Sequence, residues 1–449
     1  MSAGSKYEPN RELVDAARGA AALAKKHGAA DVVAHVSRER EVTTSWRDGK
    51  VEKVSDATTR SLSLSLYVDG RYSSVSTSDL RPQALERFIA DSVALTRSLA
   101  KDPHRKLPDP ATYAGRFDGD LEIFDPAIAA ITADQRVARA KALEEAARSA
   151  PGADKITTVT TETGDSTWEL FRFASNGFEG GNRGTGVWTE ASVSMKDDDG
   201  RRPEDWSSGH TRFLADLPSE ASVGKDATTR ALGRLGAKKI GSGTMPILVE
   251  ARAAGSVIRH LIGPISGGPL QQKESFLEGK LDKVVAAKTF TLSDEPLLKR
   301  GLNSRPFDGE GMTTKPRVLI DKGTLKSYLL DVYYASKLGM KPTTGRTTNL
   351  VVAPGTRTLA QLQKDMKNGL LVTSFLGGNS NSTTGVFSLG LSGFRVVNGE
   401  LKEPISEMNL SGKHLDFWSK LVAAGNDPYL YSSTRSPSLL FDGASIAGK

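Results

Sequence analysis

Hydrophobic residues at the start of the chain follow two different spacings. Residues 11–27 place alanine and leucine every three or four positions, which predicts an amphipathic helix. Residues 62–68 alternate strictly between aliphatic and polar side chains, which predicts a strand that buries one face and turns the other toward water or polar groups. A second helix is predicted over residues 82–99. Its expected buried stripe consists of Leu85, Phe88, Ile89 and either Leu95 or Leu99.

Two Asp-Gly dipeptides separate the predicted strands of this first segment. Asp48-Gly49 lies between two strand-like runs, and Asp69-Gly70 follows the alternating strand. Both dipeptides suit the positive φ angles of a two-residue hairpin turn. The segment is therefore expected to form an antiparallel sheet, backed by the two predicted helices.

The rest of the chain continues with strands that outnumber helices. Further helices are predicted at 133–149, 219–235, 359–367 and 413–423, and around His260. Hairpin turns are predicted at Lys322-Gly323 and Asn398-Gly399. Because the helices do not alternate regularly with the strands, the pattern favours an α+β fold. We expect an N-terminal unit with a hairpin sheet, a middle unit and a β-rich C-terminal domain, with boundaries at 1–110, 111–237 and 238–449.

Composition narrows the class of protein. The 449 residues are 38% hydrophobic and 25% charged, which is typical of a globular protein, and they include no cysteine. The net charge of +7 comes from scattered lysines and arginines without a basic block, so we expect no nucleic-acid partner. No long apolar run suggests a membrane span, and the polar start of the chain does not look like a secretion signal. The expected location is the cytoplasm.

Short motifs identify few sites. The run GNRGTG at 181–186 departs from the dinucleotide-binding fingerprint and is interpreted as a turn. The histidines stand singly, so no two of them form a local metal-binding pair. They are His27, His35, His104, His210, His260 and His414.

His260 is the histidine whose surroundings invite comparison with a zinc peptidase. Such a site needs about three protein ligands and a base for the attacking water. The neighbour of His260 is Leu261, and Ile265 stands where a second histidine would bind the metal. We therefore interpret His260 as a lone remnant, packed or hydrogen-bonded at the end of a helix, in a chain without a catalytic or metal site.

Five segments, in the same order, resemble the TldD/PmbA family, also called modulator-of-DNA-gyrase proteins. This family acts as a two-subunit zinc peptidase, and the resemblance covers most of the chain. The segments are WRDGKVEKVSDATTRSLSLSLYVDGRYSSVSTSDL, SVIRHLIGPISGGPLQQKESFL, YLLDVYYASKLGMKPTTG, FLGGNSNSTTGVFSLGLSGFRVVNGELKEPISEMNLSG and AAGND.

The resemblance implies which of the two subunit types this chain is. The TldD type carries H-E-x-x-x-H and a distant cysteine, whereas here only His260 matches that pattern. The chain is thus similar to the PmbA (TldE) type, which has no zinc of its own and no expected activity alone. Val386 is a departure, because many PmbA-type sequences have an acid there. The region that would supply the cysteine reads Gly377, Gly378, Asn379, Ser380 and Asn381.

The implied function is that of a non-catalytic subunit in a TldD/TldE-type zinc metallopeptidase. Its partner would be a TldD-type subunit that holds the zinc, although a homodimer of this chain alone is also possible. The implied substrates are unfolded peptides, such as leader peptides of modified peptide antibiotics and antitoxin-like proteins. Residues 376–385 either bind such a peptide through their backbone or form an ordinary polar loop. The alternatives are a non-enzymatic regulator of DNA gyrase and a homodimeric peptidase with an unrecognised site.

Overall fold

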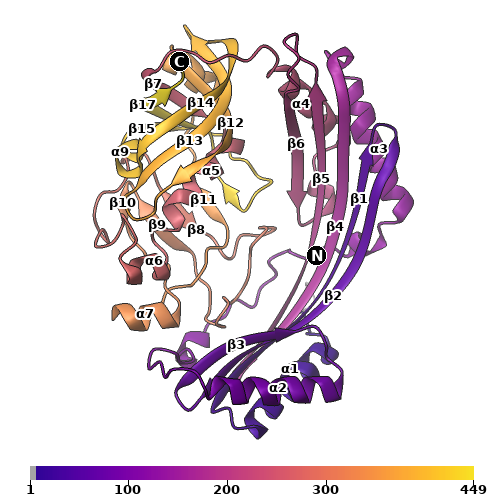
Figure 1. Ribbon diagram of the computed structural model, residues 1–449, viewed down its shortest axis with the longest axis vertical. Coiled ribbons are helices and arrows are strands. Elements are labelled where there is room, and N and C mark those ends of the chain that lie inside the picture. Colours follow the sequence, from indigo (N-terminus) through magenta and orange to yellow (C-terminus); the bar gives the residue numbers. More distant parts are fainter. Residues whose placement is uncertain (1–6) are drawn as a thin grey trace.

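A computed structural model describes residues 7–449 and has two main parts, a long antiparallel sheet and a β-rich C-terminal domain (Figure 1). The mixed sheets and separate helices confirm the predicted α+β class. Residues 1–6, which begin the polar N-terminal segment that does not resemble a secretion signal, lie outside the described residues. Within the described part, no helix is long and apolar enough to cross a membrane.

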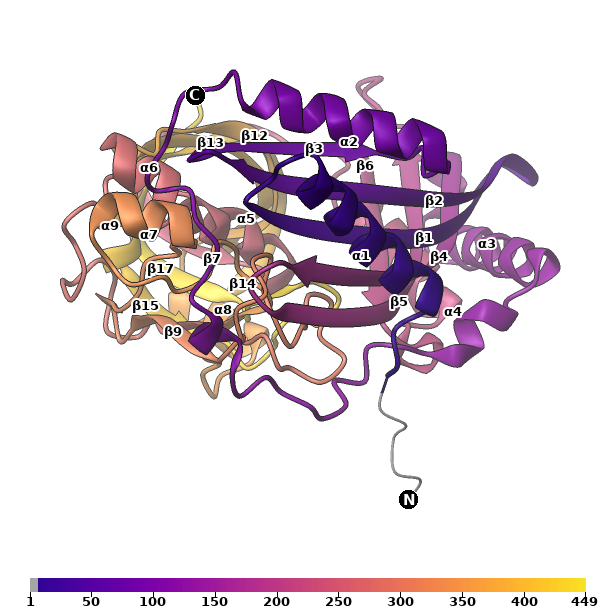
Figure 2. The same cartoon turned by 90° about the horizontal axis from the view of Figure 1, so that it is seen from below.

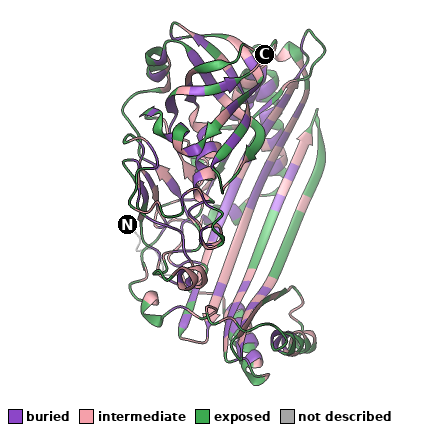
Figure 3. Cartoon of the chain, turned by 60° about the vertical axis from the view of Figure 1, so that its left-hand side comes forward, coloured by how far each residue is buried: buried purple, intermediate pink, exposed green. Residues whose placement is uncertain are grey.

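The long sheet has six strands in the order β3-β2-β1-β4-β5-β6. Pairing of β1 with β4 joins the first segment of the chain to the middle segment in one sheet. Exposed residues run along much of β2, as Figure 3 shows on the outer strands. The boundaries proposed for three domains stay a prediction. The strands are β1 (Asp31–Arg47), β2 (Lys50–Val68), β3 (Arg71–Thr77), β4 (Ile156–Ala174), β5 (Phe178–Met195) and β6 (Glu204–Thr211).

Four helices cover one face of this sheet, and α1 and α2 lie across the end formed by β3, β2 and β1 (Figure 2). Val159 and Phe171 of β4 contribute to the apolar clusters under these helices. Because side chains alternate along a strand, Leu170 and Arg172 lie on the opposite face. The helices are α1 (Arg11–Lys26), α2 (Pro82–Thr96), α3 (Ala133–Arg148) and α4 (Glu220–Leu232).

Both predicted Asp-Gly turns are confirmed. Asp48 and Gly49 have φ angles of 44° and 85°, and Asp69 and Gly70 have φ angles of 50° and 77°. Each dipeptide therefore forms a tight turn between antiparallel strands.

The predicted stripe on α2 is wrong at its C-terminal end. The helix is buried through Ile89, Ser92, Val93 and Thr96, whereas Leu95 is 60% exposed. Ser92 and Thr96 could occupy the buried stripe because their hydroxyls donate hydrogen bonds to backbone carbonyls one turn earlier.

The turn predicted at residues 181–186 is also wrong, since this run lies inside β5. A Cβ on Gly184 would come within 2.4 Å of Trp168 Cζ2, and one on Gly181 within 2.7 Å of Pro9 Cγ. The glycines therefore leave space for neighbouring side chains and do not reverse the chain.

The C-terminal domain contains two further sheets. One has the order β14-β13-β12-β7-β17-β15, and an additional pairing between β14 and β17 closes most of it into a small barrel. The other has the order β10-β9-β8-β11-β16. The barrel strands are β7 (Gly243–Val249), β12 (Gly369–Ser380), β13 (Val386–Val397), β14 (Glu400–Lys413), β15 (Leu421–Ala424) and β17 (Leu439–Ala447). The others are β8 (Leu292–Asp294), β9 (Arg317–Asp321), β10 (Thr324–Leu325), β11 (Leu350–Val352) and β16 (Thr434–Arg435).

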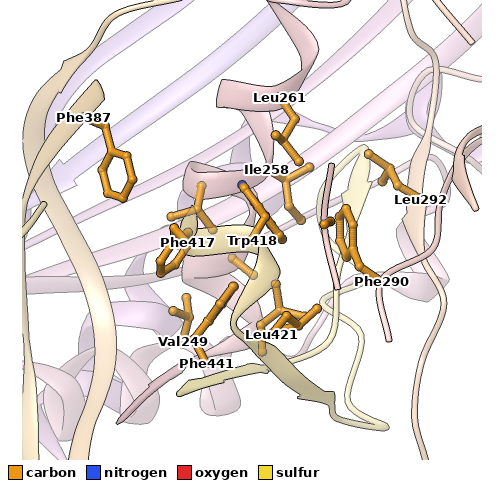
Figure 4. Packing of buried hydrophobic residues seen from close by; sticks show 14 of the residues in the cluster. Val249, Ile258, Leu261, Phe290, Leu292, Phe387, Phe417, Trp418, Leu421 and Phe441 are labelled. Carbon is orange, nitrogen blue, oxygen red and sulfur yellow. The ribbon is translucent and has the colours of Figure 1, made fainter. Parts of the chain in front are cut away.

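Four helices of this domain, α5, α6, α7 and α9, pack around the largest hydrophobic core, part of which Figure 4 shows, and α8 packs on a separate cluster. The helix predicted at 413–423 is shorter than expected, because Leu421 and Ala423 pair with β17 and form β15 instead. The hairpin turns at 322–323 and 398–399 are confirmed by their positive φ angles. The helices are α5 (Ala251–Ile262), α6 (Gly267–Gln272), α7 (Val332–Leu338), α8 (Leu359–Met366) and α9 (His414–Ser419).

Candidate functional site

Helix α5, which carries His260, follows the buried central strand β7. Its apolar residues recur at helical spacing and face the core, so the helix is amphipathic. It ends at Ile262 with Gly263 as its C-cap, and Pro264 follows, a residue that cannot continue the hydrogen-bond ladder. His260 therefore lies in the last turn, and it is partly exposed.

The two positions that a zinc site would need are part of the hydrophobic core. Leu261 is 1% exposed and Ile265 is 2% exposed, and both belong to the core cluster of the C-terminal domain (Figure 4 labels Leu261). An ionised carboxylate or an unpaired imidazole at either position would lose its hydration without gaining a partner. The sequence around His260 is thus adapted to packing.

The structure brings His260 next to another histidine, His414, at the start of α9. Their ring centroids are 5.5 Å apart and the rings are nearly parallel, with an interplanar angle of 28°. Sequence analysis missed this pair because the two residues lie far apart in the chain, in α5 and α9. No spacing signal could have revealed it.

His414 is enclosed by aromatic rings. Phe387 stacks on it at 4.5 Å and Phe276 at 5.5 Å, measured between centroids. Ser380 Oγ lies 2.8 Å from His414 Nε2, so these atoms share a hydrogen bond. Burial, reinforced by the nearby His260, lowers the pKa of His414 to about 4. The imidazole is therefore neutral near pH 7 and a weak proton acceptor.

Residues 376–385 form the end of a strand and the turn that follows it. Gly377, Gly378, Asn379 and Ser380 belong to β12 and pair with β13, and Asn381 starts the turn between the two strands. Two register shifts interrupt the ladder, and Gly377 and Gly378 have φ angles of 106° and 138°. A Cβ on Gly378 would lie 2.2 Å from the carbonyl oxygen of Ser388, so glycine is required there.

One edge of β12 is open next to this cluster. Strand β7 pairs with β12 only over Leu370–Val372, and then the chain turns into α5. Within residues 7–449, the remainder of β12 has a strand neighbour only on the β13 side. An unpaired strand edge presents backbone donors and acceptors to an extended segment.

The residues present do not fit a catalytic zinc ion. Such a site requires about three protein ligands with an open position for water. His260 and His414 stack face to face, and one nitrogen of His414 already bonds to Ser380. Across the described part of the chain, no group of three or more His, Cys, Asp or Glu residues is placed to hold a metal ion.

Val386, the departure noted in the sequence, opens β13 and is 48% exposed. Its backbone carbonyl accepts a hydrogen bond from Asn381 N. The side chain is thus free to face a ligand or a partner, but it offers no charge.

Three domain models of one protein family match this chain. The PmbA/TldA metallopeptidase domain 1 matches residues 31–96, the central domain matches residues 126–235, and the C-terminal domain matches residues 242–448. The metalloprotease PmbA of Escherichia coli O157:H7 is 32% identical over 100% of this chain and 99% of its own length. The PmbA homologue of Haemophilus influenzae is 31% identical over 98% of this chain and 96% of its own.

Solved structures share the fold over nearly the whole chain. A protein from Bacteroides thetaiotaomicron, named as a candidate modulator of DNA gyrase, is 37% identical with a TM-score of 0.94, covering 98% of this chain and 100% of that one. TldE from Thermococcus kodakarensis has a TM-score of 0.87 at 18% identity, over 96% of this chain and 100% of its own, which is a likeness of fold. The chain belongs to the PmbA/TldD metallopeptidase family.

Proposed function

We propose that this chain is the non-catalytic subunit of a TldD/TldE-type zinc metallopeptidase that cleaves unfolded peptides in the cytoplasm. The observation that carries the proposal is the burial of Leu261 and Ile265 beside His260, where a metallopeptidase would place its base and second ligand. The catalytic zinc would then belong to a TldD-type partner. Leader peptides of modified peptide antibiotics and antitoxin-like proteins are the substrates that the family resemblance suggests.

The open edge of β12 supports a role in holding such a peptide. Beyond Val372, within residues 7–449, no strand pairs with β12 on the side away from β13, close to the cluster around His414. A peptide that pairs with this edge would be extended, as a substrate must be for attack on one of its bonds.

The decisive experiment measures cleavage of an unstructured peptide by each subunit alone and by the mixture. We expect activity only from the mixture, because the zinc and the strand edge that would position the peptide belong to different subunits in this proposal. His260→Ala in this chain should leave the rate within a few-fold. Replacing the glutamate of the partner's H-E-x-x-x-H motif should remove a general base and lower the rate by roughly 10²-fold or more.

A second candidate, a homodimeric peptidase, is favoured by one observation, the hydrogen bond between Ser380 and His414. This pair resembles a nucleophile and its base, although burial of His414 makes that base weak. Cleavage by the purified chain alone that disappears in Ser380→Ala would support this candidate and overturn the proposal. A salt-dependent effect on gyrase or DNA binding without peptide cleavage would support a regulatory protein instead.

A further inference from the structure

A cleft of about 520 Å³ lies between the long sheet and the C-terminal domain, away from the His260 cluster. One wall is the helix-free face of the sheet, with Tyr67 of β2, Tyr72 of β3 and Arg172 of β4. The opposite wall consists of loops of the C-terminal domain at 305–310 and 345–346 and the start of α7. This volume is in the range of sites that hold a small ligand or the end of a peptide.

Most charged groups that line the cleft are already engaged. The Arg105 guanidinium lies over the Tyr333 ring, 3.4 Å from its centroid, and 4.5 Å from that of Tyr72. Asp308 accepts two backbone hydrogen bonds within its own loop, and Asp331 caps α7 through Tyr334 N. These contacts hold the walls of the cleft together.

Arg305 is also engaged, since its Nη2 donates to the carbonyl oxygens of Arg346 and Thr347. Three charged side chains that line the cleft have no such contact within residues 7–449, namely Arg172 on the sheet wall and the exposed Lys106 and Arg346. Within residues 7–449 the Arg172 guanidinium has no hydrogen bond or ion pair, although Asp308 and Glu310 act on it over a longer distance. Its nitrogen atoms are accessible to solvent, and the side chain lines the cleft.

The balance of charge in the cleft favours an anion. Five basic side chains line it against three carboxyls. Burial, together with the nearby Asp308 and Asp331, raises the pKa of Glu310 to about 7. Near neutral pH this carboxyl is therefore partly protonated and repels an anion less. A guanidinium with free donors binds a carboxylate through two parallel hydrogen bonds.

We propose that this cleft binds the C-terminal carboxylate of an unfolded peptide, with Arg172 as its anchor and Tyr67, Tyr72 and Tyr333 around the last side chain. The inference rests on the proposed function, because it takes the ligand to be a peptide. Tyr333 lines the cleft while its neighbour Tyr334 packs on Gly267 of α6, shortly after the helix that carries His260. This contact connects the wall of the cleft to the segment that follows α5.

The test compares two forms of one short unstructured peptide, labelled with fluorescein at its N-terminus. One form ends in a free carboxylate and the other in an amide. Fluorescence anisotropy with the full-length chain alone should give about tenfold tighter binding of the free carboxylate. Arg172→Met should abolish this preference, whereas Arg87→Met, an exposed arginine on the outer side of α2, should preserve it.

Equal affinity of the unmodified chain for the two peptides would overturn the inference, and so would a full preference in a folded Arg172→Met variant. If Arg172→Met does not fold, Arg346→Ala at the exposed rim should still reduce the preference. N-acetylalanine should compete much more weakly than the peptide. Equally strong competition would assign the cleft to small carboxylates and overturn the peptide assignment.

The result is independent of the cleavage experiment. If this chain is needed for cleavage but amidation has no effect on binding, the cleft inference fails and the proposed function stands. If amidation weakens binding but the partner cleaves equally well without this chain, the proposed function fails and the carboxylate site stands.

Discussion

Glu310 should make the stability of this protein depend on pH, and Glu310→Gln should remove that dependence. Its pKa is raised from 4.5 to about 7 because burial disfavours the charged form, with Asp308 and Asp331 acting in the same direction and Arg172 against them. Its only described hydrogen bond is accepted by Oε2 from Val332 N at 2.9 Å. Glutamine can keep that bond without carrying a charge.

The sign and size of the effect follow from linkage. Because the folded-state pKa is the higher one, the favourable contribution is fully present below pH 4.5 and is lost as the pH rises through about 7. At about 1.4 kcal/mol per pKa unit, ionising Glu310 in the folded chain costs about 3 kcal/mol above that pH. Glu310→Gln should therefore be more stable than the unmodified chain at pH 8 and nearly equal to it at pH 5.

Thermal unfolding at both pH values measures this difference between the two proteins. Glu145→Gln, which changes an exposed glutamate on α3, is the matched control and should respond to pH as the unmodified chain does. An identical shift of the melting temperature for the unmodified chain and Glu310→Gln between pH 5 and pH 8 would refute the reasoning. That outcome would mean that the cleft is more hydrated than its burial indicates.

Three further predictions concern packing and metal content. Gly70→Val should cost on the order of 1 kcal/mol in unfolding free energy because φ is 77° there, although only Lys101 side-chain atoms lie within 4 Å; the exposed helical Gly19→Ala should instead be neutral or stabilising. Leu261→Glu should lower the melting temperature strongly, by burying a charge in the core, whereas the exposed Arg259→Glu should not. Elemental analysis after dialysis against a mild chelator should find far less than one zinc per chain, and a full equivalent would contradict the metal assignment.

Local patterns in the sequence predicted much of the fold. Strict alternation at 62–68 and the Asp-Gly dipeptides were sufficient for the N-terminal hairpins, since turn conformation and side-chain direction are set within a few residues. Residues 181–186 were misassigned because their glycines make room for side chains such as Trp168 that are distant in sequence. The helix at 413–423 was overextended for a related reason, because pairing with β17 decides the conformation of its second half.

The candidate site was predictable only in part. Replacement of a base and a ligand beside His260 could be recognised from neighbouring residues, and the structure adds that Leu261 and Ile265 are buried. The contact between His260 and His414 depends on the closure of the barrel and has no local signal. The cleft at Arg172 is assembled from separate segments, so no single motif could have indicated it.

Packing accounts for the residues at positions 261 and 265, but it does not account for the unpaired edge of β12 or the unpaired Arg172 guanidinium within residues 7–449. Full burial of a leucine or isoleucine side chain contributes roughly 1.5–3 kcal/mol, so a subunit that need not bind zinc gains stability by filling positions 261 and 265 with core residues. The same pressure would favour pairing the open edge of β12 and neutralising Arg172. Both remain free in residues 7–449, beside a buried and well-packed core. Stability alone does not account for them, and binding of an extended peptide with a free carboxylate would use both.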